Sequence, residues 1–215
     1  PMAELGRLHD LVIGDCDDDG DDDLVLSGEM QTALALRQET GFSSPALTPV
    51  SGPSTRSVFG DTDHDGDLDL LLMSDGGQRL LINDGGGTFA DRSDASGLSA
   101  EPGSEAVFAD FDNDRDVDFL TLGSERADGT AIELYTNNRD GTFSEVAGRK
   151  GLDLPGATDI AVGDFNADTF MDVVTLNGSE APALFANQHG RLFVLGEIAA
   201  KAPGFQGVRA ADLDN

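Results

Sequence analysis

The chain has 215 residues, a formal net charge of −28 at neutral pH and a single cysteine. This length suffices for one large domain or a run of repeats, and a lone cysteine excludes an internal disulfide. With 13 Lys and Arg against 41 Asp and Glu, the chain lacks the basic face with which proteins bind nucleic acid. No apolar run approaches the roughly 20 residues of a transmembrane helix, so we expect no direct membrane span.

An acidic pattern, Asp-x-Asp-x-Asp-Gly-x-x-Asp in its fullest form, returns along the chain. Complete copies occupy residues 15–23, 61–69, 110–118 and 164–172, and a truncated copy begins at Asp212. Successive copies begin 46, 49, 54 and 48 residues apart. Such a regular interval indicates a protein built from structural repeats.

Each complete copy stands between two short apolar runs, which predict strands because turn residues bound them. The runs before the copies are residues 11–14, 57–60, 106–109, 160–163 and 207–210. The runs after them are residues 24–26, 70–73, 119–122 and 173–176. A third strand is predicted in each repeat, at residues 33–36, 79–82, 132–135 and 183–186.

Three of the third strands lead into a turn of the pattern Asn-x-x-x-Gly-x-Phe. The turns are residues 83–89, 137–143 and, with the glycine one residue early, 187–193. Asn, Asp and Gly are expected to supply the positive backbone angles of a tight hairpin, and Phe to begin a fourth strand. The first repeat keeps only Gly41 and Phe42 of this pattern. Residues 43–56 are predicted to connect the first two repeats or to form a binding loop.

Four antiparallel strands recurring every 40 to 50 residues or so are typical of β-propeller blades. We therefore predict an all-β chain, a single propeller region over residues 1–215, made of four-stranded antiparallel blades. The predicted blades span residues 8–54, 55–103, 104–156 and 157–204, with the start of a fifth at 205–215. Because the last acidic copy is cut short, we expect a fragment of a larger ring.

The acidic copies predict calcium loops, since Ca²⁺ takes about six to eight oxygen ligands and alternate residues of a tight turn point inward. Side chains at the first, third, fifth and ninth positions and the carbonyl of the seventh are the expected ligands. The four copies hold 20 of the 41 acidic residues and one of the 13 basic ones, a repulsion that a cation would relieve. The predicted ligand residues are Asp15, Asp17, Asp19, Asp21 and Asp23; Asp61, Asp63, Asp65, Asp67 and Asp69; Asp110, Asp112, Asp114, Asp116 and Asp118; and Asp164, Asn166, Asp168, Phe170 and Asp172.

The four loops are not equivalent. The first two have the full acidic set and a glycine, whereas Arg115 replaces the glycine of the third, where left-handed backbone costs about 1 to 2 kcal/mol. The fourth loses a charge at Asn166 and carries β-branched Thr169 at the turn. We expect three calcium sites and a weaker fourth. Flanking strands and the absence of a Glu at the twelfth position argue against EF-hands.

The acidic loop between two apolar strands, followed by Asn-x-x-x-Gly-x-Phe, resembles the FG-GAP/VCBS repeats of integrin alpha-subunit propellers and of many secreted bacterial proteins. The segments after the turns, residues 89–98 and 143–152, are most similar to the cartilage acidic protein and UnbV-type branch. The resemblance implies a seven-bladed propeller with calcium between the first two strands of a blade. It also implies an extracellular, periplasmic or cell-surface location.

These features favour a calcium-stabilised module that docks a protein partner within a larger assembly. Catalysis is not expected, because the chain has no Gly-x-Ser-x-Gly elbow, phosphate-binding glycine loop or Cys/His zinc pattern. One alternative is a carbohydrate-binding lectin or the non-catalytic propeller of a polysaccharide-acting enzyme. The absence of Trp and the presence of only Tyr135 weaken it, because sugar rings usually stack on such side chains. Another alternative is a structural spacer in a repetitive surface protein.

Overall fold

The structure is a computed structural model. It describes residues 5–39, 41–42, 48–123, 132–152, 156–177 and 182–196. These residues form four four-stranded sheets and one two-stranded ladder. The prediction of an all-β chain of four-stranded units is therefore confirmed, while the predicted strand at 207–210 lies outside the described residues.

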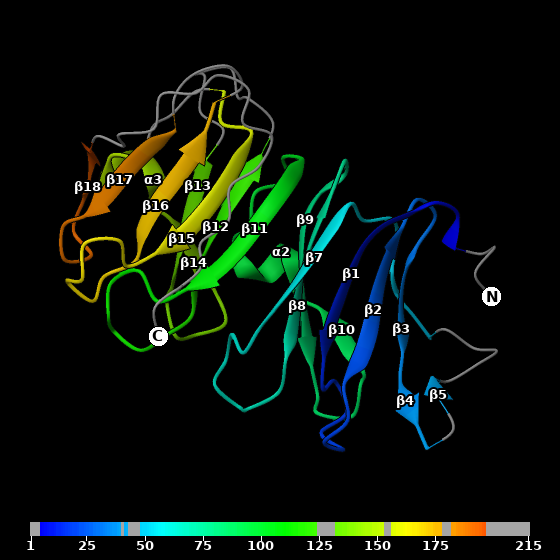
Figure 1. Ribbon diagram of the computed structural model, residues 1–215. Helices are drawn as coiled ribbons and strands as arrows, with labels where there is room; N and C mark the ends of the chain where they lie inside the picture. Colours follow the sequence, from blue (N-terminus) through cyan, green and yellow to red (C-terminus); the bar gives the residue numbers. More distant parts are fainter. Residues whose placement is uncertain are drawn as a thin grey trace. The chain divides into compact units, whose positions relative to one another are not determined.

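Within each four-stranded sheet, the strands lie side by side in the order in which they occur along the chain, the meander of a propeller blade (Figure 1). The first sheet contains β1 (Leu8–Gly14), β2 (Asp23–Gly28), β3 (Thr32–Ala35) and β6 (Thr48–Ser51). The second contains β7 (Arg56–Gly60), β8 (Asp69–Ser74), β9 (Gly77–Asn83) and β10 (Phe89–Asp91). The third contains β11 (Gly103–Ala109), β12 (Asp118–Gly123), β13 (Ile132–Asn137) and β14 (Phe143–Glu145). The fourth contains β15 (Asp159–Gly163), β16 (Asp172–Leu176), β17 (Ala183–Asn187) and β18 (Phe193–Gly196).

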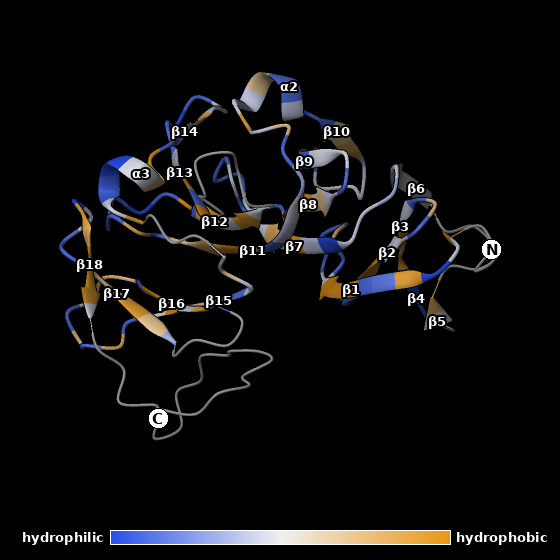
Figure 2. Ribbon diagram, turned by 90° about the horizontal axis from the view of Figure 1, so that it is seen from above, coloured by the Kyte–Doolittle hydropathy of each residue, from blue (hydrophilic) through white to orange (hydrophobic). Residues whose placement is uncertain are grey.

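The second strand is the most buried element of the second, third and fourth sheets. Every residue of β8 and of β16 is buried. Since successive strand residues point to opposite faces, these strands are covered on both sides, which explains why their sequences read as continuous apolar runs. Figure 2 colours β12 as hydrophobic along most of its length and many of the connecting loops as hydrophilic. Burial of the central strands thus anchors the loops that precede them.

The chain divides into two compact units, residues 1–106 with 137–143, and residues 107–136 with 144–215. In the first unit, the first two sheets share a core of Cys16, Val25, Leu34, Leu70, Leu72 and Leu81. In the second unit, the third and fourth sheets share a larger core that includes Phe111, Leu120, Leu134, Ile160, Val173 and Phe193. Each core therefore lies between neighbouring sheets, as expected when a single blade cannot bury its own faces.

The first sheet departs from the prediction at its fourth strand. Gly41–Phe42 forms β5, which pairs with β4 (Arg37–Gln38) in the separate ladder. The fourth strand is instead β6, which pairs with β3. Residues 43–56 were predicted to be a connection or a binding loop, whereas Thr48–Ser51 within them is a strand of the first sheet. The physical reason is that the first repeat lacks the Asn-x-x-x-Gly-x-Phe turn, so the chain makes a longer excursion before it returns to the sheet.

Short helices occupy the segments that follow the turns at residues 83–89 and 137–143. α2 (Ser93–Ser96) and α3 (Ala147–Lys150) end at Gly97 and Gly151, whose φ angles are 80° and 78°. A Cβ on Gly97 would lie 2.9 Å from the Phe143 carbonyl oxygen, and one on Gly151 would lie 3.0 Å from that of Phe193. Both glycines thus combine a left-handed angle with close contact to the next sheet. Among the described residues, no helix has the length and apolar character needed to cross a membrane.

Candidate metal centres

Each acidic loop connects the first strand of its sheet to the second and folds around its own carboxylates. The first-position carboxylate accepts the N–H of the sixth residue: Gly20 to Asp15 at 2.9 Å, Gly66 to Asp61 at 3.3 Å, Arg115 to Asp110 at 2.9 Å and Thr169 to Asp164 at 2.8 Å. The fifth-position carboxylate accepts the N–H of the seventh residue: Asp21, Asp67, Asp116 and Phe170, at 2.9 to 3.0 Å. All four loops therefore share one backbone conformation.

Backbone angles support the same conclusion. The sixth residues have positive φ, including the non-glycine residues Arg115 at 75° and Thr169 at 77°, which confirms the turn predicted there. The fourth residues also have positive φ, which the sequence did not indicate. These are Asp18, His64, Asn113 and Ala167, with φ between 58° and 62°. Two left-handed residues let alternate side chains converge on one side of the loop.

Three of the loops bring carboxylates together. Within each group, one oxygen from every member lies within 4.8 Å of the others: Asp15, Asp17 and Asp19; Asp61, Asp63 and Asp65; and Asp110, Asp112 and Asp118. Four buried oxygens in these groups have no hydrogen-bond partner, namely Oδ1 of Asp15, Asp17, Asp61 and Asp112. Buried carboxylate oxygens without donors are costly unless a cation neutralises them. The donor set, all oxygen, is the one that Ca²⁺ prefers, so these residues fit the predicted metal.

The local electrostatics are unfavourable without a cation. Burial is the main cause that raises the pKa of the Asp17 carboxyl, and the charges of Asp23, Asp19 and Asp15 raise it further. Burial and Asp114 likewise raise the pKa of Asp112, while Lys150, with Nζ 3.8 Å from Oδ2 of Asp112, partly opposes this. A positive ion in the first loop would lower the pKa of Asp17 again, and one in the third loop would lower that of Asp112.

The fourth loop differs from the other three. Asn166 Oδ1 accepts the N–H of Asp168 at 2.9 Å, so the loop closes without a third charge. Asp164 is exposed, whereas the corresponding Asp15, Asp61 and Asp110 are half-buried. Residues 164–172 contribute neither a group of three acidic side chains nor a buried oxygen without a partner. The fourth loop thus has the same backbone conformation as the others, but its side chains have less negative charge for a cation to neutralise.

The ninth-position carboxylates have a role that the sequence did not reveal. Asp23, Asp69, Asp118 and Asp172 are at most 1% exposed. Each accepts the N–H of the second loop residue, from Cys16, Thr62, Phe111 and Phe165, at 2.9 to 3.1 Å. Asp69 and Asp172 also accept the N–H of Asn83 and Asn187 in the same sheet, and Asp23 accepts that of Arg37 in β4, which follows β3 along the chain. These carboxylates fasten the loop to the sheet, and Asp118 also belongs to a converging group.

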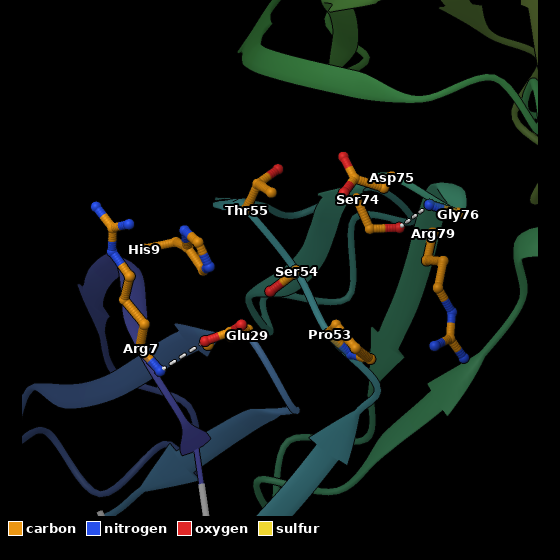
Figure 3. A pocket seen from close by; sticks show the side chains of 11 residues that line it. Arg7, His9, Glu29, Pro53, Ser54, Thr55, Ser74, Asp75, Gly76 and Arg79 are labelled. Atoms are coloured by element: carbon orange, nitrogen blue, oxygen red, sulfur yellow. Dashed lines mark hydrogen bonds between the residues drawn. The ribbon is translucent and has the colours of Figure 1, made fainter.

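A second feature is a pocket of about 760 Å³ in the first unit, at the strand ends opposite the loops. In Figure 3, His9 of β1 and Glu29, which follows β2, surround it together with Thr55, which precedes β7, and Asp75, which follows β8. At its edge, Arg79 donates to Ser51 at 2.5 Å and pairs with Asp91. Eight of the eleven lining residues have polar or charged side chains, with charges of both signs, and His9 is the only one with an aromatic ring.

The sheets and acidic loops together define a repeat protein of the β-propeller class. A family model of the FG-GAP-like repeat matches residues 15–72, 61–121 and 122–175, which is most of the chain. This chain belongs to the FG-GAP-like repeat family. The first two matches begin at one acidic loop and extend beyond the next. The repeat defined by the family model therefore includes sequence from two consecutive sheets.

A similar solved structure is that of an Agrocybe aegerita lectin, described as specifically recognising non-reducing terminal N-acetylglucosamine. The two share a TM-score of 0.52 and 18% identity over 85% of this chain and 49% of the lectin. This chain thus spans about half the length of that lectin, and the likeness shows the fold alone. Comparison with curated proteins gives no significant match.

Proposed function

We propose that this chain is a calcium-stabilised, non-catalytic propeller module that docks a protein partner at the cell surface or outside the cell. The observation that carries the calcium proposal is the set of buried carboxylate oxygens without donors in the first three loops. Surface turns that are merely acidic turn their carboxylates to water, whereas these oxygens point into closed loops. The residues that would hold the ions are the three converging groups, with the seventh-position carbonyls as further ligands.

The proposed role of the ion is structural. A bound cation supplies positive charge that neutralises the loop carboxylates. Residues of the chain hold the loop in place. The carboxylates at the first and fifth loop positions accept hydrogen bonds from the loop backbone, and the carboxylate at the ninth position, as in Asp69, fastens the loop to the third strand. Calcium-binding modules outside cells typically have dissociation constants of roughly 0.1 to 1 mM, which matches calcium levels there. That match supports the proposed location, as does the typical occurrence of FG-GAP-like repeats in extracellular proteins.

Thermal unfolding in chelator and in calcium tests the proposal. At a calcium concentration of about ten times the dissociation constant, each occupied site adds about 1.4 kcal/mol to the free energy of unfolding. We expect the melting temperature to rise by several degrees in calcium. Magnesium at the same concentration is the control and should raise it less, because Mg²⁺ demands tighter octahedral geometry. Equal melting temperatures in chelator and calcium would contradict the proposal.

Carbohydrate binding is a second candidate, which the polar pocket favours. Carboxylate, guanidinium, imidazole and hydroxyl groups of Glu29, Asp75, Arg7, His9 and Thr55 would suit the hydroxyls of a sugar. The lectin likeness supports a propeller as a scaffold for such a site. A glycan array is the test, with Asp75→Asn as the pocket variant and Asp94→Asn, outside this pocket, as the matched control. If the chain binds no glycan on the array and instead binds an extracellular protein, the result favours the docking module.

A further inference from the structure

An asparagine at the end of the third strand recurs in the second, third and fourth sheets. The side-chain amides of Asn83, Asn137 and Asn187 donate to the carbonyl oxygen of the second residue in the acidic loop of the preceding sheet. The acceptors are Cys16 at 2.9 Å, Thr62 at 2.8 Å and Phe111 at 2.7 Å. The same bond thus occurs three times, and each pair lies within one compact unit.

The remaining groups of these asparagines bind their own sheet. The side-chain oxygens of Asn83, Asn137 and Asn187 accept a turn N–H from Gly85, Arg139 and Gly190, respectively. The amides of Asn83 and Asn187 donate again, to Leu68 at 3.3 Å and to Met171 at 3.0 Å. The Asn83 side chain is only 3% exposed and that of Asn187 is fully buried. Each asparagine is therefore held in one orientation and presents a fixed donor to the preceding loop.

The acceptor peptide is itself part of the loop closure. In the first loop, the N–H of Cys16 donates to Asp23 while its carbonyl accepts from Asn83. The N–H of Asn83 then donates to Asp69, which also accepts the N–H of Thr62, whose carbonyl accepts from Asn137. Hydrogen bonds therefore run without a break through Asp23, Cys16, Asn83, Asp69, Thr62 and Asn137. The second unit repeats this arrangement from Asp118 through Phe111 and Asn187 to Asp172 and Phe165.

We propose that these asparagines are positioning residues that couple the cation loops of consecutive sheets. The inference rests on the proposed calcium function and goes beyond it. When a loop closes around an ion, the backbone of its second residue is held in place. The carbonyl oxygen of that residue is then positioned to accept the hydrogen bond from the asparagine of the next sheet. The main-chain N–H groups of Asn83 and Asn187 in turn hold the ninth-position carboxylates of their own loops, Asp69 and Asp172. Occupation of one loop therefore strengthens the contact between sheets and raises the affinity of the next loop, and the coupling is reciprocal.

The test compares Asn83→Ala with Ser57→Ala in chelator and in calcium. Ser57 is the matched control, because its hydroxyl also bonds across the first two sheets, to Ser27 at 2.9 Å, but lies outside the loops. We expect Asn83→Ala to lose much of the calcium-induced rise in melting temperature and to weaken calcium binding, measured by calorimetry, about five-fold or more. Ser57→Ala should lower the melting temperature equally in both conditions.

The outcomes separate the two proposals. If the unaltered chain shows no rise in melting temperature with calcium, the proposed function fails. If the unaltered chain shows the rise and Asn83→Ala retains all of it, only the coupling is overturned. Should Asn83→Ala not fold, Asn137→Ala is the milder variant, since the Asn137 side chain is half-buried. A loss of stability from Asn137→Ala that is the same with and without calcium would likewise overturn the coupling.

Discussion

The main-chain N–H of Thr62 donates a 2.9 Å hydrogen bond to the carboxylate of Asp69, at the other end of the same acidic loop. Asp69 is fully buried, and its second oxygen accepts the N–H of Asn83 at 3.0 Å. Burial raises the pKa of Asp69, and the hydrogen bonds from Thr62 and Asn83 offset only part of that rise. The carboxylate therefore has a structural role that does not depend on a cation.

We predict that Asp69→Ala destabilises the chain even in chelator. The substitution leaves the N–H groups of Thr62 and Asn83 buried without an acceptor, at about 1 to 3 kcal/mol each. Urea unfolding in chelator measures the change. Asp65→Ala is the control, because Asp65 is exposed and its loss should cost less than about 1 kcal/mol without calcium. Equal effects of the two variants in chelator would show that the ninth position does not anchor the loop.

In calcium, Asp65→Ala should cost more stability than Asp168→Ala. Both residues occupy the fifth position, and both accept the N–H two residues ahead, at 3.0 and 2.9 Å. Burial alone predicts the opposite order, since Asp168 is half-buried and Asp65 is exposed. The expected difference is about 1.4 kcal/mol at calcium concentrations about ten times the dissociation constant. Unfolding of both variants with and without calcium checks it, and a larger calcium-dependent loss in Asp168→Ala would reverse our ranking of the loops.

The sequence predicted the features that repeat locally. Strands flanking each acidic copy, and the left-handed angle at Arg115 and Thr169, follow from patterns within about ten residues. The bond from Asn83 to Cys16 joins residues 67 positions apart, and a single repeat gives no sign of it. The asparagines were predicted as sources of positive φ. In the turn at residues 83–89, Asn83 instead ends a strand, and Gly85 and Gly87 provide the positive angles.

Thr169→Gly should stabilise the chain by about 1 kcal/mol, because Thr169 holds a left-handed φ of 77° that a β-branched residue adopts only with strain. Thr169 also accepts from the Asn113 amide, through its carbonyl at 3.2 Å and its hydroxyl at 3.4 Å. Thr169→Ala is therefore the matched control, since it removes the hydroxyl but keeps Cβ. Thermal unfolding compares the two variants. A glycine variant no more stable than the alanine variant would show that the turn carries no strain.

Cys16 should resist thiol reagents in the native chain. Its side chain is 1% exposed, and burial, reinforced by the charges of Asp23, Asp15 and Asp17, raises its pKa to about 12. Because thiolates are the reactive species, labelling at about pH 8 requires opening of the first loop. We expect slow labelling by a chromogenic disulfide, slower still in calcium, and rapid labelling of one thiol after denaturation. Asn83→Ala should accelerate the native reaction, because the donor that holds the Cys16 carbonyl is lost. Native labelling as fast as that of the denatured chain would contradict a packed first loop.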